Sequence, residues 1–233
     1  MREYRQTILA ETWIPTLSGM SSEIGVTVSK QLRGLRPALE EWIVLNGAIA
    51  KCWTEVEDVP WWYNERALLG VLAGAIWRTG GLAFEEYTQR KLTRNDRKDV
   101  GGRVDLWFST KSGREFRAEA KKTEIPITQS ADQLEKLNAV MAEAVDDAGR
   151  NPSDGGDTTR LAIAFASPFL TKKTDPKMLQ SRVNDFLELF DDVDYDAIAW
   201  FFPKMKRLPV SESDHVTPGI VMWMKVVKRG RRA

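Results

Sequence analysis

The chain is poor in the side chains that build disulfides, zinc sites and imidazole-based active sites. Its 233 residues include one cysteine, Cys52, and one histidine, His215. A lone cysteine cannot form an internal disulfide, so we expect a reducing, cytoplasmic setting and a packed rather than a nucleophilic thiol. A lone histidine, expected here in an exposed polar loop, excludes a Cys/His zinc site and a histidine-based nuclease. Any catalysis must therefore use carboxylates and lysines.

Several other common signals are missing. No apolar run is long enough to span a bilayer, and the first residues lack the charged-then-apolar pattern of a signal segment, so we expect no membrane partner. No glycine-rich loop ends in Lys-Ser or Lys-Thr, which argues against ATP hydrolysis. The formal net charge is only +1, so the chain as a whole is not a bulk electrostatic DNA binder.

Two strand-like segments, residues 102–108 and 115–122, stand out because charges interrupt them. Half-buried strands usually avoid such charges. Strand alternation places Asp105 on the polar face of the first segment, while apolar side chains occupy the opposite face. Glu119 and Lys121 lie on the polar face of the second segment in the same way. Each segment therefore offers one face to a core and one face to chemistry.

The connection between these segments predicts a hairpin. A three-residue loop over residues 111–113 puts Gly113 at the position where a positive φ is favoured, and glycine adopts it without steric cost. This register places Asp105 directly opposite Glu119. Like charges in that arrangement destabilise a hairpin unless a cation lies between them. Lys121, one step along the same face, would then point at whatever the cation holds.

Two facing carboxylates suit a hard divalent cation such as Mg²⁺ or Mn²⁺, which prefers oxygen ligands. A bound cation polarises a phosphoryl oxygen and lowers the pKa of a bound water. A neighbouring lysine can position or activate that water, or stabilise the developing charge. These residues therefore predict phosphodiester hydrolysis. The alternative is a cross-strand charge ladder on a solvated face, without catalytic function.

The same residues resemble the motif of the PD-(D/E)xK nuclease superfamily. The motif stands here as Val104-Asp105 followed by Glu119-Ala120-Lys121, with valine in place of the proline. The resemblance implies an α/β, restriction-endonuclease-like fold with a mixed central β-sheet flanked by helices. It also implies that Asp105, Glu119 and the Ala120 carbonyl hold Mg²⁺ or Mn²⁺, and that Lys121 acts on the attacking water.

Members of that superfamily tend to carry a glutamate on a helix before the first core strand, and Glu65 is the best match. Glu65 could equally be an ordinary first-turn acid behind Asn64, which could cap the helix. The resemblance implies a nuclease; DNA is favoured over RNA as its substrate and an endonuclease over an exonuclease, and both alternatives stay open. A homodimer is one arrangement left open, because double-strand cutters with one such site often act in pairs.

The expected order of elements is compatible with that fold. Helices are predicted at residues 61–78, 130–148 and 176–190, and strands at 82–91, 161–166, 197–202 and, as a last edge strand, 219–227. Residues 1–60, with helices predicted at 5–13 and 39–53, form an N-terminal helical extension packed on a nuclease-like core of residues 61–233.

Basic side chains gather just before and within the hairpin, where they would suit a phosphate backbone passing the acidic site. The predicted nucleic-acid contacts are Arg90, Lys91, Arg94, Arg97, Lys98 and Arg103. A solvated basic loop is the simpler alternative. The competing function is a catalytically inactive nuclease-fold protein that binds a nucleic acid or a protein, using the tryptophan-rich N-terminal half.

Overall fold

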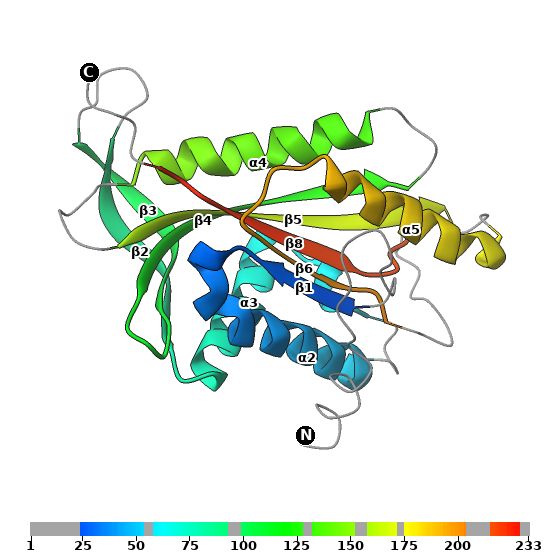
Figure 1. Ribbon diagram of the computed structural model, residues 1–233, viewed down its shortest axis with the longest axis horizontal. Coiled ribbons are helices and arrows are strands. Elements are labelled where there is room, and N and C mark those ends of the chain that lie inside the picture. The colour runs from blue at the N-terminus through cyan, green and yellow to red at the C-terminus, as the bar shows by residue number, and fades with distance from the viewer. Residues whose placement is uncertain are drawn as a thin grey trace.

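The computed structural model describes residues 24–53, 58–92, 99–127, 132–151, 158–171, 175–203 and 215–228. These residues form an α/β protein built on one mixed sheet with helices on both faces (Figure 1). The coarser part of the predicted fold class, an α/β protein with a mixed central sheet flanked by helices and an N-terminal helix, is confirmed. The helix predicted over residues 5–13 lies outside the described residues.

The sheet has eight strands, of which seven form one continuous row. In spatial order these are β1 (Ile24–Val28), β6 (Ala197–Phe201), β8 (Ile220–Val226), β5 (Thr159–Thr171), β4 (Glu115–Pro126), β3 (Asp99–Ser109) and β2 (Leu82–Leu92). The two-residue strand β7 (His215–Val216) pairs with β5. Among the described strands, only β4 and β5 pair in parallel, and α4 (Gln133–Gly149) connects them. A parallel neighbour requires such a crossover connection.

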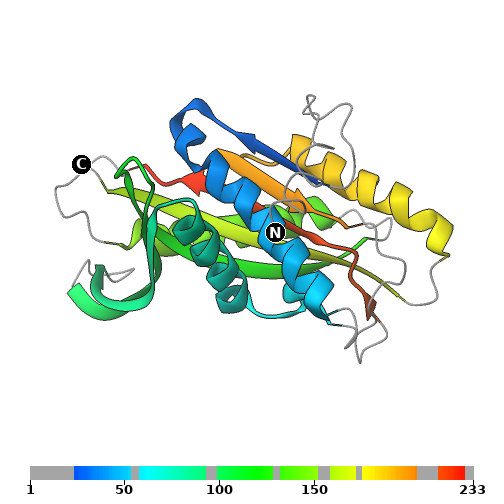
Figure 2. The ribbon, with the colours of Figure 1, turned by 90° about the horizontal axis from the view of Figure 1, so that it is seen from below.

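Two layers of helices enclose the sheet. α2 (Arg36–Trp53) and α3 (Glu65–Arg78) lie together on one face, as Figure 2 shows from below. α4 and α5 (Leu179–Glu188) lie on the other face (Figure 1). Short 3-10 turns complete the helical structure: η2 (Lys30–Leu35), η4 (Pro60–Trp62), η5 (Pro176–Met178) and η6 (Leu189–Asp191). None of the described helices is long and apolar enough to cross a membrane.

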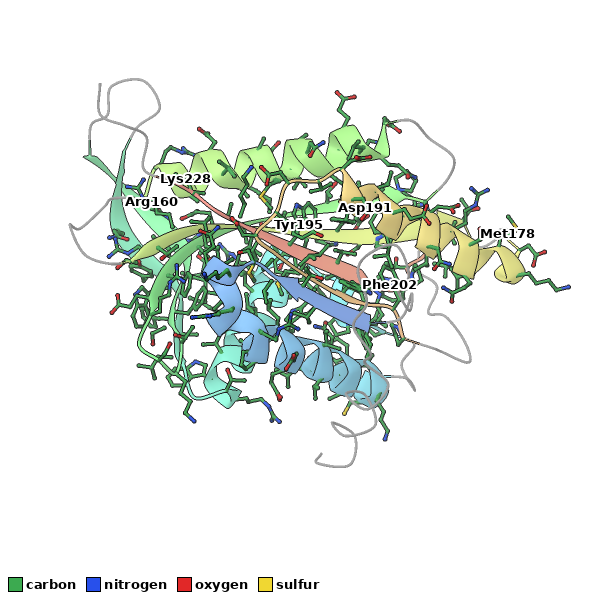
Figure 3. The ribbon with its side chains drawn as sticks, in the orientation of Figure 1. Arg160, Met178, Asp191, Tyr195, Phe202 and Lys228 are labelled. Carbon is green, nitrogen blue, oxygen red and sulfur yellow. The ribbon has the colours of Figure 1, made fainter. Side chains whose placement is uncertain are left out.

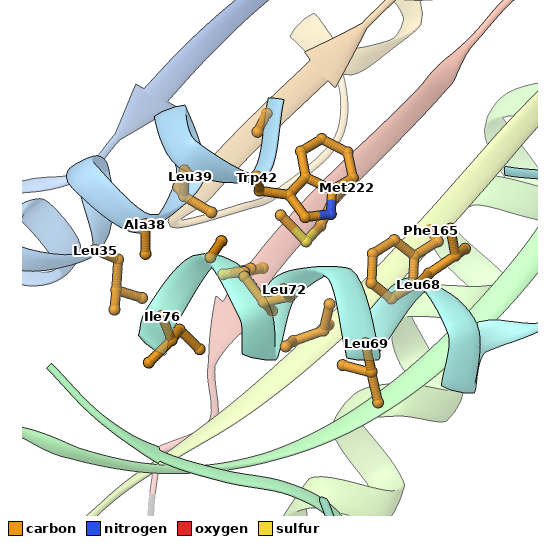
Figure 4. Close-up of a cluster of buried hydrophobic side chains, with 14 of the residues drawn as sticks. Leu35, Ala38, Leu39, Trp42, Leu68, Leu69, Leu72, Ile76, Phe165 and Met222 are labelled. Carbon is orange, nitrogen blue, oxygen red and sulfur yellow. The ribbon is translucent and has the colours of Figure 1, made fainter. Parts of the chain in front are cut away.

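The core under α2 and α3 is built from large side chains at helical spacing. Leu39 and Trp42 of α2 and Leu68 of α3 are at most 1% exposed and point toward the sheet. Figure 4 shows them meeting Phe165 of β5 and Met222 of β8. Burial of side chains this large supplies most of the driving force for docking the helices. Trp42, a residue of the tryptophan-rich N-terminal half, is therefore a core residue.

Two strands differ from the sequence prediction. The prediction that β8 is an edge strand is wrong, because β8 lies between β6 and β5 and its residues 220–224 are all buried. β1, which was not predicted, pairs with β6 and is itself an edge strand of the sheet. The chain before α2 is therefore not purely helical. His215 also differs from the expected exposed loop residue, since it lies in β7 and its ring stacks on Phe169 at 4.3 Å. The expectation of a packed thiol is wrong as well, because Cys52 is exposed on α2.

Candidate active site

The predicted hairpin between β3 and β4 is confirmed in its turn and, as far as Leu106 and Ala118, in its register. Gly113 has a φ of 83°. The Gly113 amide donates to the Thr110 carbonyl at 2.8 Å, and the Thr110 amide donates to the Arg114 carbonyl at 2.9 Å. Ladder pairs run from Ser109 opposite Glu115 to Leu106 opposite Ala118. Extending this register by one step would place Asp105 opposite Glu119.

The two strands separate at this next step, so the predicted pair of Asp105 opposite Glu119 is not part of the ladder. Beyond Leu106 the pairing of β3 continues only with β2, and the pairing of β4 continues only with β5. The Asp105 carboxylate lies at the separation, where its Oδ2 accepts a hydrogen bond from the Ala120 amide at 2.9 Å. Because the N–H and C=O of a strand residue point to the same edge, the Ala120 carbonyl also faces the gap. We call this point the fork.

Glu119 lies beside the fork and is held from α4's side of the sheet. Its side chain is only 3% exposed, and its Oε1 accepts a hydrogen bond from Asn151 Nδ2 at 2.9 Å. Asn151 follows the end of α4 and is fully buried. Its Oδ1 has no hydrogen-bond partner among the described residues. A buried acceptor without a hydrogen bond lowers the stability of the fold, so a donor or a cation bound at this oxygen would be favourable.

Lys121 lies on the same side of β4 as Glu119 and does not enter the core. Its Nζ pairs with Asp147 Oδ2 at 2.6 Å, and its side chain keeps 34% of its exposure. Asp147, whose side chain is 17% exposed, also pairs with Arg150 through its other oxygen. The ammonium of Lys121 is therefore directed by a carboxylate on the last turn of α4.

The two contacts come from the C-terminal end of α4. Asp147 is in the last turn of this helix, and Asn151 follows two residues after the helix ends. Glu119 and Lys121 are two residues apart, about 6.5 Å along a strand. Sequence reasoning missed both residues, because Asp147 comes 26 positions after Lys121 and Asn151 comes 32 positions after Glu119, and no local signal links them.

A third carboxylate, Glu86, occupies the β2 position that the register would place opposite Asp105. The β2–β3 pairing skips this residue, whose φ is 57°. Such a φ is uncommon for a residue other than glycine. Arg66 of α3 pairs with Glu86 Oε1 at 2.9 Å, and Arg103 pairs with its other oxygen. Ion pairs with two arginines therefore fix the side chain of Glu86, the residue at which the β2 backbone is distorted next to the fork.

Glu65, the predicted auxiliary acid, is the first residue of α3, and Asn64 caps that helix by accepting from the Ala67 amide at 3.2 Å. α3 packs on the apolar face of the hairpin, opposite the face that carries Asp105. Within the described residues, no hydrogen bond or ion pair joins Glu65 to Asp105, Glu119 or Lys121. A catalytic role for Glu65 stays a prediction.

Most of the predicted nucleic-acid contacts cannot be placed. Arg94, Arg97 and Lys98 lie outside the described residues, as do the side chains of Arg90 and Lys91. Arg103 is exposed on β3, two residues from Asp105.

The donors at the fork suit a hard divalent cation in kind. They are the carboxylates of Asp105 and Glu119, the Ala120 carbonyl, and the unpartnered amide oxygen of Asn151, all of them oxygen atoms. No group of three or more aspartate, glutamate, histidine or cysteine side chains that could hold a metal occurs in the described part of the chain. Mg²⁺ usually binds through only one or two carboxylates and keeps several waters, so these kinds of donor are compatible with its usual ligands.

No protein-family model matches the chain, and no characterised protein or solved structure shows significant similarity to it.

Proposed function

We propose that the protein is a divalent-metal-dependent nuclease that hydrolyses phosphodiester bonds in DNA, with a site of the PD-(D/E)xK kind. The observation that carries this proposal is the hydrogen bond from the Ala120 amide to Asp105 Oδ2 at 2.9 Å. It brings Asp105 against the backbone between Glu119 and Lys121. The Asp105 carboxylate on β3 thus lies against the backbone that joins Glu119 and Lys121 on β4, at the point where the two strands separate.

The order of elements around the fork supports the proposal. α3 is followed by the antiparallel strands β2, β3 and β4, then by α4 and by β5 parallel to β4. The resemblance to PD-(D/E)xK nucleases implies the motif on the second and third of these strands, which is where Asp105 and Glu119 lie. The restriction-endonuclease-like fold is part of the same proposal.

In this mechanism Asp105, Glu119 and the Ala120 carbonyl would hold Mg²⁺ or Mn²⁺. When bound, the cation would supply positive charge beside the phosphoryl oxygens and lower the pKa of a water molecule. Lys121 orients the attacking water and stabilises the negative charge that develops on the phosphate. Glu119 is buried, and the effective dielectric constant is lower inside a protein than in water. Charge interactions at Glu119 are therefore stronger than they would be on the surface.

Asp147 and Asn151 keep the reacting groups in place. Asp147 fixes the direction of the Lys121 ammonium through their ion pair. Asn151 fixes the Glu119 carboxylate through its amide hydrogens, and its free oxygen can accept a hydrogen bond from a water at the site. Supporting groups of this kind reduce the reorganisation needed during the reaction.

The proposal is tested with purified protein on plasmid and on labelled linear DNA. Cutting is expected with Mg²⁺ or Mn²⁺ and is abolished by EDTA. Asp105→Ala and Lys121→Ala are each expected to lower the rate by about 10²- to 10⁴-fold. Lys111→Ala, which removes an exposed lysine from the hairpin turn, is the matched control and should cut normally. Equal cutting by wild type and Lys121→Ala would refute the assignment.

One observation favours the catalytically inactive alternative, namely the 3% exposure of Glu119. A carboxylate this buried must become accessible before a cation can reach it. Calorimetric titration with Mn²⁺ separates the two functions. Binding that is lost in Asp105→Ala supports the nuclease, whereas no binding to the wild type supports a binding module that has kept the fold.

A further inference from the structure

The face of the sheet that carries Asp105 continues into a row of aromatic and arginine side chains. Phe84 on β2 pairs with Trp107 on β3, Trp107 pairs with Arg117 on β4, and Arg117 pairs with Arg160 on β5. Directly opposite residues in neighbouring strands point to the same face of a sheet. These four residues therefore form one line across four strands, which we call the aromatic–arginine row.

The aromatic half of this row belongs to neither hydrophobic core. Phe84 is 62% exposed, and Trp107 is partly exposed. Neither residue is part of the two clusters of buried side chains. α3 covers the opposite face of β2 and β3, where Ala83 and Leu106 are buried. α4 packs on β4 and β5. Two large aromatic rings are thus left on the open part of the face, which folding alone does not explain.

The row adjoins the candidate active site. Trp107 is two residues from Asp105, and Arg117 is two residues from Glu119. Two residues span about 6.5 Å along a strand. Arg103 lies two residues beyond Asp105 on the same strand. Figure 3 shows Arg160 and Lys228 near each other, at the end of the sheet where β2 and β3 lie. Cations therefore flank both the carboxylates and the aromatic rings.

These side chains match the chemistry of an unpaired nucleotide. A base can stack on a tryptophan or phenylalanine ring only when its flat face is accessible, as it is in a single strand. Arginine binds a phosphate through two parallel hydrogen bonds and can also stack on a base. In a duplex the bases are already stacked on each other and cannot use such a surface.

We propose that the aromatic–arginine row binds unpaired bases of the substrate strand. The preferred substrate is therefore a nucleic acid that is single-stranded beside the phosphate to be cleaved. This inference rests on the proposed nuclease function for its choice of ligand. It predicts that binding affinity and strand preference depend on Trp107 and Phe84, whereas the hydrolytic step depends on Asp105 and Lys121.

The binding test uses Asp105→Ala protein in EDTA, so that no cleavage occurs. Fluorescence anisotropy compares a labelled 12-nucleotide single strand with a duplex of the same sequence. The single strand is expected to bind more tightly. Adding Trp107→Ala or Phe84→Ala should weaken single-strand binding by about 5- to 100-fold and leave duplex binding almost unchanged. Trp107→Phe, which keeps a ring for stacking, should restore most of the affinity.

Trp77→Ala is the matched control, because Trp77 is 54% exposed at the end of α3 and lies outside the row. It should bind like its parent. The inference is overturned if all three alanine variants weaken binding equally, if none does, or if the duplex is preferred. A second copy of the chain is the rival occupant, since β2 is an edge strand. A wild-type dimer that Phe84→Ala dissociates in sedimentation would also overturn the inference.

The cleavage and binding assays together distinguish a failure of this inference from a failure of the proposed function. If wild-type protein cuts DNA but the row variants bind normally, the nuclease stands and the stacking surface is wrong. If the row variants lose single-strand binding but wild type never cuts in Mg²⁺ or Mn²⁺, the nucleic-acid surface stands and the nuclease is wrong.

Discussion

The two faces of β4 are built from alternate residues of one strand, yet they differ in every property that matters here. Phe116, Ala118 and Ala120 are at most 1% exposed and pack in the core under α3. Glu119 and Lys121 point to the other face, and each is bound by a polar side chain at the end of α4. One face is held by apolar packing, and the other by hydrogen bonds and ion pairs.

Alternate residues of β4 therefore have different roles: one set stabilises the fold, and the other orients the groups of the proposed active site. Truncating a side chain on the apolar face lowers the protein's free energy of unfolding, because it leaves a cavity that the neighbouring side chains do not fill. The polar face contains charges whose interactions are specific in direction and only partly buried, so they contribute less to stability than to orientation. Substitutions on the two faces should therefore affect different measurements.

The largest expected effect is on the apolar face. Phe116 is fully buried and stacks on Phe108 with ring centroids 4.7 Å apart. Phe116→Ala is expected to lower the free energy of unfolding by about 3–5 kcal/mol, measured by urea denaturation. Phe84→Ala, which removes an exposed ring from the same sheet, should change it by about 0.5 kcal/mol or less. Similar losses in the two variants would contradict the assigned core.

A smaller effect is expected on the polar face. Asp147→Asn removes the charge that directs Lys121 and should lower kcat by about 10- to 100-fold, with the urea midpoint nearly unchanged. Asp147→Glu should recover part of the rate, because it restores the charge. Asp146→Asn, which alters the neighbouring exposed acid on α4, is the control. A loss of stability without a loss of kcat would show that Asp147 only supports the fold.

The smallest effect concerns Glu85, which faces α3 across from the polar site. Burial, followed by the nearby charge of Glu86, raises the pKa of Glu85 above its ordinary value of 4.5. A raised pKa means that the folded state binds the proton more tightly, so this contribution to stability is complete below pH 4.5 and is lost as pH rises through the folded pKa. Glu85→Gln should therefore be slightly more stable than wild type at neutral pH.

Thermal melts at several pH values check this prediction. The difference in Tm between Glu85→Gln and wild type should shrink as the pH falls toward 4.5. A difference that is constant with pH would instead indicate a packing effect of the amide.

Local patterns predicted the hairpin well. Alternating apolar residues and a single glycine at the turn determine both the faces and the register, and Gly113 adopts the expected positive φ. Helix α3 was equally predictable, since Asn64 caps its first turn. These features depend on residues close together in the chain, which is why sequence alone was sufficient.

Features that depend on distant residues were not predicted. Asp147 and Asn151 reach the site only because α4 runs back over β4, and no local pattern reveals that they would meet Lys121 and Glu119. β8 was taken for an edge strand, although its continuous apolar run at residues 220–224 is typical of a strand buried on both faces. The left-handed backbone at Glu86 has no sequence signal at all.

The fork has a consequence for how the site can be observed. In most of a sheet, a backbone amide is protected from hydrogen exchange by a carbonyl on the next strand. The Ala120 amide is protected instead by the Asp105 side chain. Its exchange rate therefore reports the state of one carboxylate. A cation that draws Asp105 away would speed this amide's exchange while its neighbours, paired with β5, remain slow, so one peptide hydrogen would record occupancy of the site without any substrate.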